Sequence, residues 1–202
     1  MEHSTLGLLL FIGGGYYMEM NYCSNCGEML EIRVINDEEY KACPSCSFIH
    51  WGNYSVSVGA LVIKDEKMLL VRRKDNPGKG KWTNPGGYIE QTELIEQSVI
   101  REVLEETGVI AKVKSLVMLG DYPGRVHNIY VGFLMEYMEG QPEPDEVEVD
   151  GAGFFSLEEM ESMDVADMTR GLVRIAFDQQ TVGLKLNPLP KTEFNGYTFF
   201  NV

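Results

Sequence analysis

The chain has 202 residues, a formal net charge of −14 at pH 7, and 44% hydrophobic and 24% charged residues. This length suits one medium-sized domain plus a smaller unit, and the composition is that of an ordinary globular protein with a buried core. The negative charge argues against membrane-surface binding and bulk nucleic-acid binding, because both need a basic face.

Residues 1–20 are predicted to form an N-terminal tail. The segment 6–13 is apolar, but no Lys or Arg precedes it. It therefore lacks the pattern of a secretion signal, and it is too short to cross a membrane, which takes about 20 residues. We expect a cytoplasmic protein, so disulfides are not the first expectation for its cysteines.

Residues 21–50 contain all four cysteines in the pattern C-x2-C-x16-C-x2-C. Two C-x2-C turns can direct four thiolates at one ion, which predicts a zinc ribbon. Four thiolate ligands leave no open position on the metal, so this zinc would be structural. The alternatives are two disulfides or a redox-active pair. The predicted ligands are Cys23, Cys26, Cys43 and Cys46.

The next segment, 51–182, is predicted to be the main domain. Residues 55–63 are rich in β-branched side chains and read as a strand, with 67–73 as its hairpin partner. The Gly- and Pro-rich stretch 75–88 reads as a loop. Its first part belongs to a basic stretch, 72–81, which is either a solvated hairpin tip or a phosphate-contacting loop.

Further along, a helix is expected over 93–107, because Gly108 suits the position that ends a helix. Two long strands should follow, then an acidic loop, a short strand and a helical segment with a Ser156–Glu159 capping box. A last helix is expected over 167–180. The aromatic tail, 183–202, should pack on the domain or on a second subunit. These elements predict an α/β fold with a mixed sheet between helices.

The predicted helix is acidic. Glu102, Glu105 and Glu106 fall on one face, with Ile100, Val103 and Leu104 on the side that would meet the core. Carboxylates at this spacing repel one another unless a cation lies among them. Oxygen ligands suit Mg²⁺ or Mn²⁺. The alternative is a solvated acidic face.

The segment 87–109 resembles the Nudix box, G-x5-E-x7-R-E-U-x-E-E-x-G-U with U apolar, at every specified position. Gly87, Glu93, Arg101 and Gly108 fill the fixed positions together with the three glutamates. Upstream, Asn84 stands where an apolar residue is more usual in the family. The resemblance covers about residues 54–180, and a ribbon in front is typical of a subset that includes the NADH pyrophosphatases.

The resemblance implies a Nudix fold that hydrolyses a nucleoside diphosphate linked to another group. It also implies that Glu102, Glu105 and Glu106 bind Mg²⁺ or Mn²⁺ with the Gly86 carbonyl, and that Arg101 orients a glutamate. The metals neutralise the pyrophosphate and lower the pKa of bound water. The general base in such folds often lies outside the box. Glu146 and Glu148 lie in the expected place, and Glu148 is favoured.

The substrates implied are ADP-ribose, FAD or NAD(H), with release of AMP. The chain lacks the "SQPWPF"-like motif of the NADH pyrophosphatases, which moves weight to ADP-ribose or FAD. Two alternatives stay open: a (d)NTP pyrophosphatase for nucleotide clean-up, and a non-catalytic nucleotide sensor. A homodimer is expected because twofold dimers are the commonest assemblies.

Overall fold

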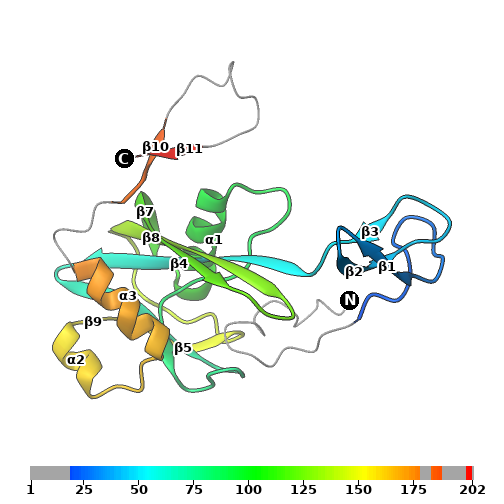
Figure 1. The fold of residues 1–202 in the computed structure, drawn as a ribbon. Helices are drawn as coiled ribbons and strands as arrows, with labels where there is room; N and C mark the ends of the chain where they lie inside the picture. Colours follow the sequence, from blue (N-terminus) through cyan, green and yellow to red (C-terminus); the bar gives the residue numbers. More distant parts are fainter. Residues whose placement is uncertain (1–18, 178–182, 188–198, 202) are drawn as a thin grey trace.

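A computed structural model describes residues 19–177, 183–187 and 199–201 (Figure 1). The N-terminal part is a small antiparallel sheet in the order β1-β2-β3, separate from the main sheet. The tight β1–β2 turn places Asn36 and Asp37 at positive φ, which Asn and Asp tolerate better than most residues. The strands are β1 (Glu31–Ile35), β2 (Glu38–Ala42) and β3 (Ile49–His50).

The main sheet has six strands in the order β6-β5-β4-β8-β7, with β9 also paired to β5. The central pair β4–β8 is parallel and the other pairs are antiparallel, so the sheet is mixed as predicted. Its strands are β4 (Tyr54–Lys64), β5 (Lys67–Arg73), β6 (Trp82–Thr83), β7 (Ile110–Tyr122), β8 (His127–Glu139) and β9 (Val149–Phe155).

Helices cover both faces of this sheet (Figure 1). Strand β4 alternates its side chains between the two layers: Val58 joins the buried cluster beneath α1 (Ile95–Thr107), and Leu61 joins the cluster beneath α3 (Asp167–Phe177). The short helix α2 (Leu157–Glu161) begins at the predicted Ser156–Glu159 capping box. The alternation along β4 therefore fixes which side of the sheet each helix covers.

Several details differ from the sequence predictions. Strand β6 lies within the stretch 75–88 that was expected to be a loop, because its two residues pair with β5. Helix α1 begins at Ile95 rather than residue 93, because the Glu93 side chain accepts the Glu90 amide and binds Arg101 in the preceding loop. Leu104 is 48% exposed, whereas Val103 and Ile100 do pack in the core. The strand expected at 153–155 begins at Val149, since its first residues pair with β5.

Part of the C-terminal tail lies outside the described residues, so the packing expected for 183–202 stays a prediction. Two short strands of the tail pair with each other, β10 (Lys185–Asn187) and β11 (Phe199–Asn201). Leu184 exchanges two backbone hydrogen bonds with Leu116 of β7. None of the helices in the described residues is long and apolar enough to span a membrane.

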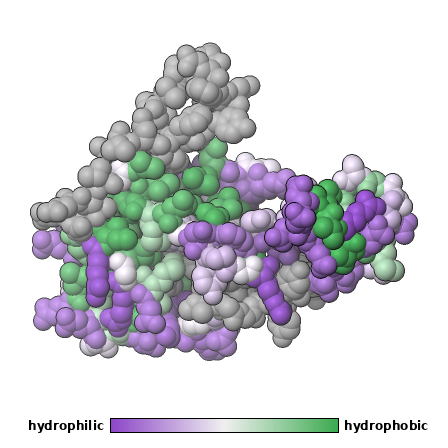
Figure 2. Space-filling model, viewed as in Figure 1, coloured by the Kyte–Doolittle hydropathy of each residue, from purple (hydrophilic) through white to green (hydrophobic). Residues whose placement is uncertain are grey.

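Exposed hydrophobic residues gather on two parts of the surface. Figure 2 shows one such area on the main body and a smaller one on the N-terminal sheet. On the edge strand β7, Leu119 and Tyr122 are exposed by more than half. On β1, Ile32 and Val34 are exposed and point to the same face, two residues apart.

Candidate functional site

The glycine loop, residues 85–87, precedes α1 and lies directly on strand β4. Ala60 N–H donates to the Pro85 carbonyl and Val58 N–H to the Gly87 carbonyl, both at 2.8 Å. Gly86 comes so close that a Cβ there would lie 2.2 Å from the Val58 carbonyl oxygen. Only glycine fits at such a close approach of two backbones. The loop is therefore fixed on the sheet before any ligand binds.

Two box glutamates bind directly to this loop from α1. The Gly86 N–H donates to Glu106 Oε2 at 2.9 Å. The Glu102 carboxyl lies against Gly87, where a Cβ would be 2.5 Å from its carbon. Both glutamates are buried, with 4% exposure for Glu106 and 9% for Glu102. Gly87 thus makes room for the Glu102 carboxylate, and the Gly86 amide binds the Glu106 carboxylate.

Arg101 connects three of the acidic side chains. Its Nη2 donates to Glu93 Oε1 at 2.6 Å, and its Nη1 lies 2.7 Å from Glu102 Oε1 and 3.0 Å from Glu105 Oε2. The hydrogen bonds from Arg101 lower the Glu93 pKa to about 2. The same partners raise the pKa of Arg101. The guanidinium therefore orients three glutamates through charge-assisted hydrogen bonds.

An acidic pocket opens beside this arginine. Burial raises the pKa of Glu102 to about 7, with repulsion from Glu105 and Glu148 adding to it. Burial also raises the Glu106 pKa well above its ordinary value. Desolvated carboxylates with too few cations favour the protonated form. The lining includes Glu90, Glu102, Glu105, Glu106, Asp145, Glu148 and Arg101.

The pocket's last acids come from the loop before β9. Glu148 lines the pocket, and burial followed by repulsion from Asp145 raises its pKa. Asp145 also lines the pocket. Its Oδ1 accepts the amides of Val147, Glu148 and Val149 at 2.9 to 3.0 Å. Asp145 thus shapes the turn that presents Glu148.

The residues of the pocket fit a divalent cation by charge and by space. Mg²⁺ and Mn²⁺ prefer oxygen ligands, and the carboxylates of this pocket supply them together with negative charge that few cations balance. The carboxylate oxygens are spread more widely than in a closed ligand set, because Arg101 lies between Glu102 and Glu105. A cation in the pocket would lower the pKa values of Glu102 and Glu106, which burial raises, because its positive charge stabilises the ionised carboxylates.

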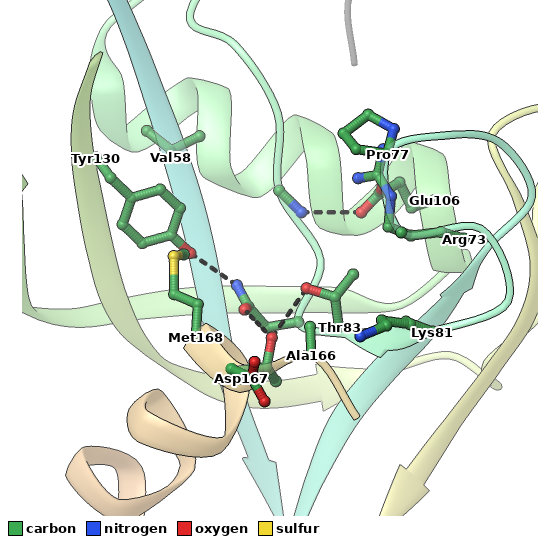
Figure 3. A pocket seen from close by; sticks show the side chains of 14 residues that line it. Val58, Arg73, Pro77, Lys81, Thr83, Glu106, Tyr130, Ala166, Asp167 and Met168 are labelled. Atoms are coloured by element: carbon green, nitrogen blue, oxygen red, sulfur yellow. Dashed lines mark hydrogen bonds between the residues drawn. The ribbon is translucent and has the colours of Figure 1, made fainter. Parts of the chain in front are cut away.

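A second cavity lies on the other side of Gly86 and Glu106, both of which line it (Figure 3). Arg73 and Lys81 bring positive charge to its wall, so part of the predicted basic stretch does face a cavity. Its remaining lining includes Val58, Pro77, Thr83, Asn84, Tyr130 and Thr169.

Two ring side chains lie elsewhere. Trp82 packs edge-on against Phe155, with ring centroids 4.8 Å apart. His127 pairs with Asp121 and stacks on Tyr54 at a centroid distance of 5.6 Å. Neither side chain lines the acidic pocket or the second cavity.

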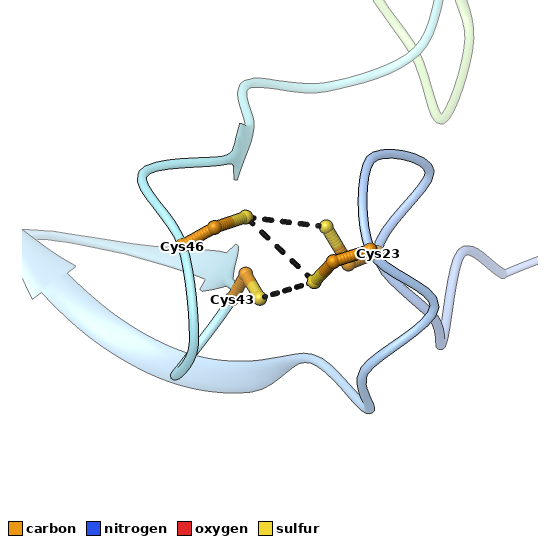
Figure 4. A group of neighbouring side chains, drawn as sticks. Cys23, Cys43 and Cys46 are labelled. Carbon is orange, nitrogen blue, oxygen red and sulfur yellow. Dashed lines mark hydrogen bonds between the residues drawn. The ribbon is translucent and has the colours of Figure 1, made fainter.

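The four cysteines converge in the N-terminal unit (Figure 4). Within the described residues, no other set of three or more Cys, His, Asp or Glu side chains has all its ligand atoms within 4.8 Å of one another. The Sγ–Sγ distances of 3.4 Å (Cys26–Cys43), 3.6 Å (Cys23–Cys46) and 3.8 Å (Cys26–Cys46) are too long for disulfides. They fit the edges of a ZnS₄ tetrahedron, about 3.8 Å for Zn–S bonds of about 2.3 Å.

Comparison with known families decides the class of this fold. The family model described as "NUDIX domain" matches residues 53–174, which is more than half of the chain. The chain belongs to the Nudix family. It is accordingly a Nudix hydrolase, and the segment 87–109 is its box.

Among its relatives, an ADP-ribose pyrophosphatase of Methanocaldococcus jannaschii is 38% identical over 131 residues, which cover 63% of this chain and 70% of that protein. The NAD-capped RNA hydrolase NudC of Pseudomonas aeruginosa is 33% identical over 141 residues, covering 68% of this chain and 48% of that protein. This Nudix hydrolase thus spans about half the length of the Pseudomonas relative.

Solved structures show the same fold. A Nudix hydrolase of Nitrosomonas europaea superposes with a TM-score of 0.71 at 27% identity, covering 79% of this chain and 92% of that one. A bifunctional NMN adenylyltransferase/ADP-ribose pyrophosphatase of Francisella tularensis, complexed with AMP and a manganese ion, gives 0.52 at 27% identity, covering 62% and 41%.

Proposed function

We propose that this Nudix hydrolase cleaves the pyrophosphate bond of a nucleoside diphosphate linked to another group, with ADP-ribose as the preferred substrate and AMP as a product. The observation that carries the proposal is the acidic pocket between the glycine loop and α1. Among the described residues, its lining has six carboxylates and one cationic side chain, Arg101. The archaeal relative named ADP-ribose pyrophosphatase supports the choice of substrate.

In this proposal Glu102, Glu105 and Glu106 hold Mg²⁺ or Mn²⁺ with the Gly86 carbonyl. The bound metal would neutralise the diphosphate and polarise phosphorus. Arg101 keeps Glu102 and Glu105 aimed into the pocket through its hydrogen bonds. Glu148 takes the proton from the attacking water as the bridging P–O bond breaks. Its raised pKa makes Glu148 a stronger base than an ordinary glutamate.

The zinc assignment is a separate proposal. The four thiols of residues 21–50 would hold one zinc ion that fixes the loops of the N-terminal sheet. The sulfur geometry supports this, because the four Sγ atoms lie within 4.8 Å of one another. A thiolate is the form that binds zinc. The domain boundaries 21–50 and 51–182 follow from the same division.

The test is a substrate panel with separated products. Purified protein is incubated with Mg²⁺ and ADP-ribose, NADH, FAD or dNTPs, and products are resolved by chromatography. The double variant Glu105→Gln, Glu106→Gln removes two charges of the pocket while keeping side-chain size. The matched control is Glu158→Gln, which changes an exposed glutamate on α2.

AMP from ADP-ribose, lost in the double variant and kept in the control, is the expected result. AMP from NADH or FAD instead would keep the reaction and change the substrate. Pyrophosphate from dNTPs alone would support nucleotide clean-up. Nucleotide binding without turnover of any compound would overturn the enzymatic assignment for these substrates and favour the sensor.

A homodimer is part of the same proposal. The exposed Leu119 and Tyr122 on edge strand β7 supply apolar surface that a second copy could cover. Light scattering coupled to size-exclusion chromatography measures the mass directly. A mass of one chain at micromolar concentration would contradict the dimer.

A further inference from the structure

A buried polar cluster lies beneath the glycine loop, outside the acidic pocket. It consists of Asn84 before the loop, Tyr130 on β8 and Thr169 on α3, with Thr83 at its edge (Figure 3). Exposure is 6% for Asn84, 5% for Tyr130 and 1% for Thr169. Buried polar side chains are costly unless their hydrogen bonds are made, so this cluster needs an explanation.

Its hydrogen bonds converge on the Asn84 amide. Asn84 Nδ2 donates to Tyr130 Oη at 2.9 Å and to the Pro85 carbonyl at 3.2 Å. Thr169 Oγ1 donates to Asn84 Oδ1 at 3.2 Å and lies 2.9 Å from Thr83 Oγ1. Donors and acceptor of one side chain thus connect the glycine loop to β8 and to α3.

The sheet leaves space for this arrangement. A Cβ at Gly59 of β4 would lie 1.6 Å from Tyr130 Oη and 2.6 Å from Asn84 Nδ2. No side chain larger than hydrogen fits there while the cluster is intact. Gly59 is the direct neighbour of Gly132 in the parallel β4–β8 register. The two strands therefore provide a place for the tyrosine hydroxyl at the level of the loop.

The cluster acts on the backbone that holds the glutamates. Asn84 precedes Pro85, whose carbonyl accepts both the Asn84 side chain and the Ala60 amide. One residue further, Gly86 N–H donates to Glu106. A shift of Asn84 would therefore move the Gly86 amide away from the buried carboxylate.

We propose that Asn84 is a positioning residue, which Tyr130 and Thr169 hold in place so that Gly86 keeps Glu106 oriented between the acidic pocket and the second cavity. The role of Glu106 as a ligand rests on the proposed function. The positioning of the Gly86 amide does not, and it can be measured without substrate.

The test compares Thr169→Val with Thr169→Ser, and Asn84→Ala with wild type. Valine keeps the shape of threonine but lacks the hydroxyl that Asn84 accepts from, whereas serine restores it. Asn128→Ala is the matched control. Asn128 bonds to Ser55 and Ser57 on the same pair of strands but does not line the second cavity.

Three readouts are taken well below the melting temperature: hydrogen exchange of the Gly86 amide by NMR, Mn²⁺ binding by electron paramagnetic resonance, and kcat and KM. We expect Asn84→Ala and Thr169→Val to speed Gly86 exchange about tenfold. Mn²⁺ affinity and kcat should fall by roughly 10- to 100-fold, as for other residues that support metal ligands. Thr169→Ser and Asn128→Ala should stay near wild type.

Unchanged Gly86 exchange in Asn84→Ala would overturn the positioning role, whatever happens to turnover. Equal loss in Thr169→Val and Thr169→Ser would also overturn it, because the hydroxyl would not be the cause. If wild type shows no turnover, the proposed function fails. The exchange measurement still decides this inference.

Discussion

Two glutamates of one loop, Glu146 and Glu148, show that the local backbone determines which side chain reaches the pocket. Glu148 lines the acidic pocket, whereas Glu146 does not and has a positive φ of 60°. The Glu146 carbonyl accepts a hydrogen bond from Lys74. The sequence offers both as a base, and the turn formed by Asp145 separates them.

Glu148→Gln should lower kcat by about 10²- to 10⁴-fold, because the amide cannot take a proton from water. Mn²⁺ affinity should change far less than in the Glu105→Gln, Glu106→Gln double variant. Steady-state kinetics and Mn²⁺ titration measure the two effects. Glu146→Gln is the control, and a larger loss there than at Glu148 would reassign the base.

At the scale of elements, two glycines in different parts of helices can be compared. Gly108 ends α1 in the left-handed region with φ 66°, and no neighbour would clash with a Cβ there. Gly171 lies inside α3 with open space around it. Replacing each glycine by alanine therefore tests the backbone conformation alone: left-handed at Gly108 and helical at Gly171.

Gly108→Ala should destabilise the protein by about 1 kcal/mol, because alanine disfavours the left-handed conformation. Gly171→Ala should stabilise it by about 0.5 to 1 kcal/mol, because alanine is the better helix residue. Urea unfolding of the two variants in parallel measures both. Changes of the same sign would show that helix-end conformation does not control stability here.

Elements with local signals were predictable from the sequence. The 67–73 strand, the Gly108 helix end and the Ser156–Glu159 capping box match the structure, since each depends on neighbouring residues. The exposure of Leu104 was not predictable in this way. A helical wheel gives faces but does not say which face the sheet covers, and Leu104 lies off the face of α1 on which Val99, Val103 and Thr107 are buried.

The site residues also fall into a predictable group and an unpredictable one. The box glutamates and Arg101 stand at fixed spacing on one helix, so their grouping could be predicted. Asp145 was missed because its place in the pocket depends on how its loop meets α1, although its own hydrogen bonds are local. Asn84 was missed because its partners lie far along the chain. Asn84 contacts Tyr130 and Thr169, 46 and 85 residues away. Its polar nature at a usually apolar position was the one signal available.

For the whole molecule, the acidic pocket should make stability depend on pH. The folded-state pKa of Glu102 is about 7, above the ordinary value of 4.5, and that of Glu106 is also raised. Without Mg²⁺, the folded protein holds protons that the unfolded chain releases, so stability should fall as pH rises from about 4.5 to 7. The lowered Glu93 pKa acts in a separate window, below about 4.5.

Thermal melts at pH 5 to 8 without added divalent metal, compared with Glu102→Gln, measure this slope. The variant should show a smaller decline, because it lacks one titrating group. Added Mg²⁺ should raise the melting temperature more at pH 8 than at pH 5, since the ligands must be ionised. A metal-free stability that increases over this range would contradict the raised pKa values.

The cysteine unit leads to a prediction about metal content. Cys43→Ser should abolish stoichiometric zinc, measured by plasma mass spectrometry, because the buried Cys43 sulfur is one of the four proposed ligands. The sheet β1-β2-β3 should lose order, while the main sheet, which shares no strand with it, should keep its fold by NMR. Full zinc retention in this variant would contradict the four-thiolate site.

The parallel pairing of β4 with β8 has a consequence for how the protein reaches its native state. Tyr54 is aligned with His127, a separation of 73 residues (127 − 54), and the loop and helix of the box lie between them. Such non-local pairing slows folding because the chain must close a long loop first. During synthesis, catalytic competence should therefore appear only after β8 has been made, well after the last box residue.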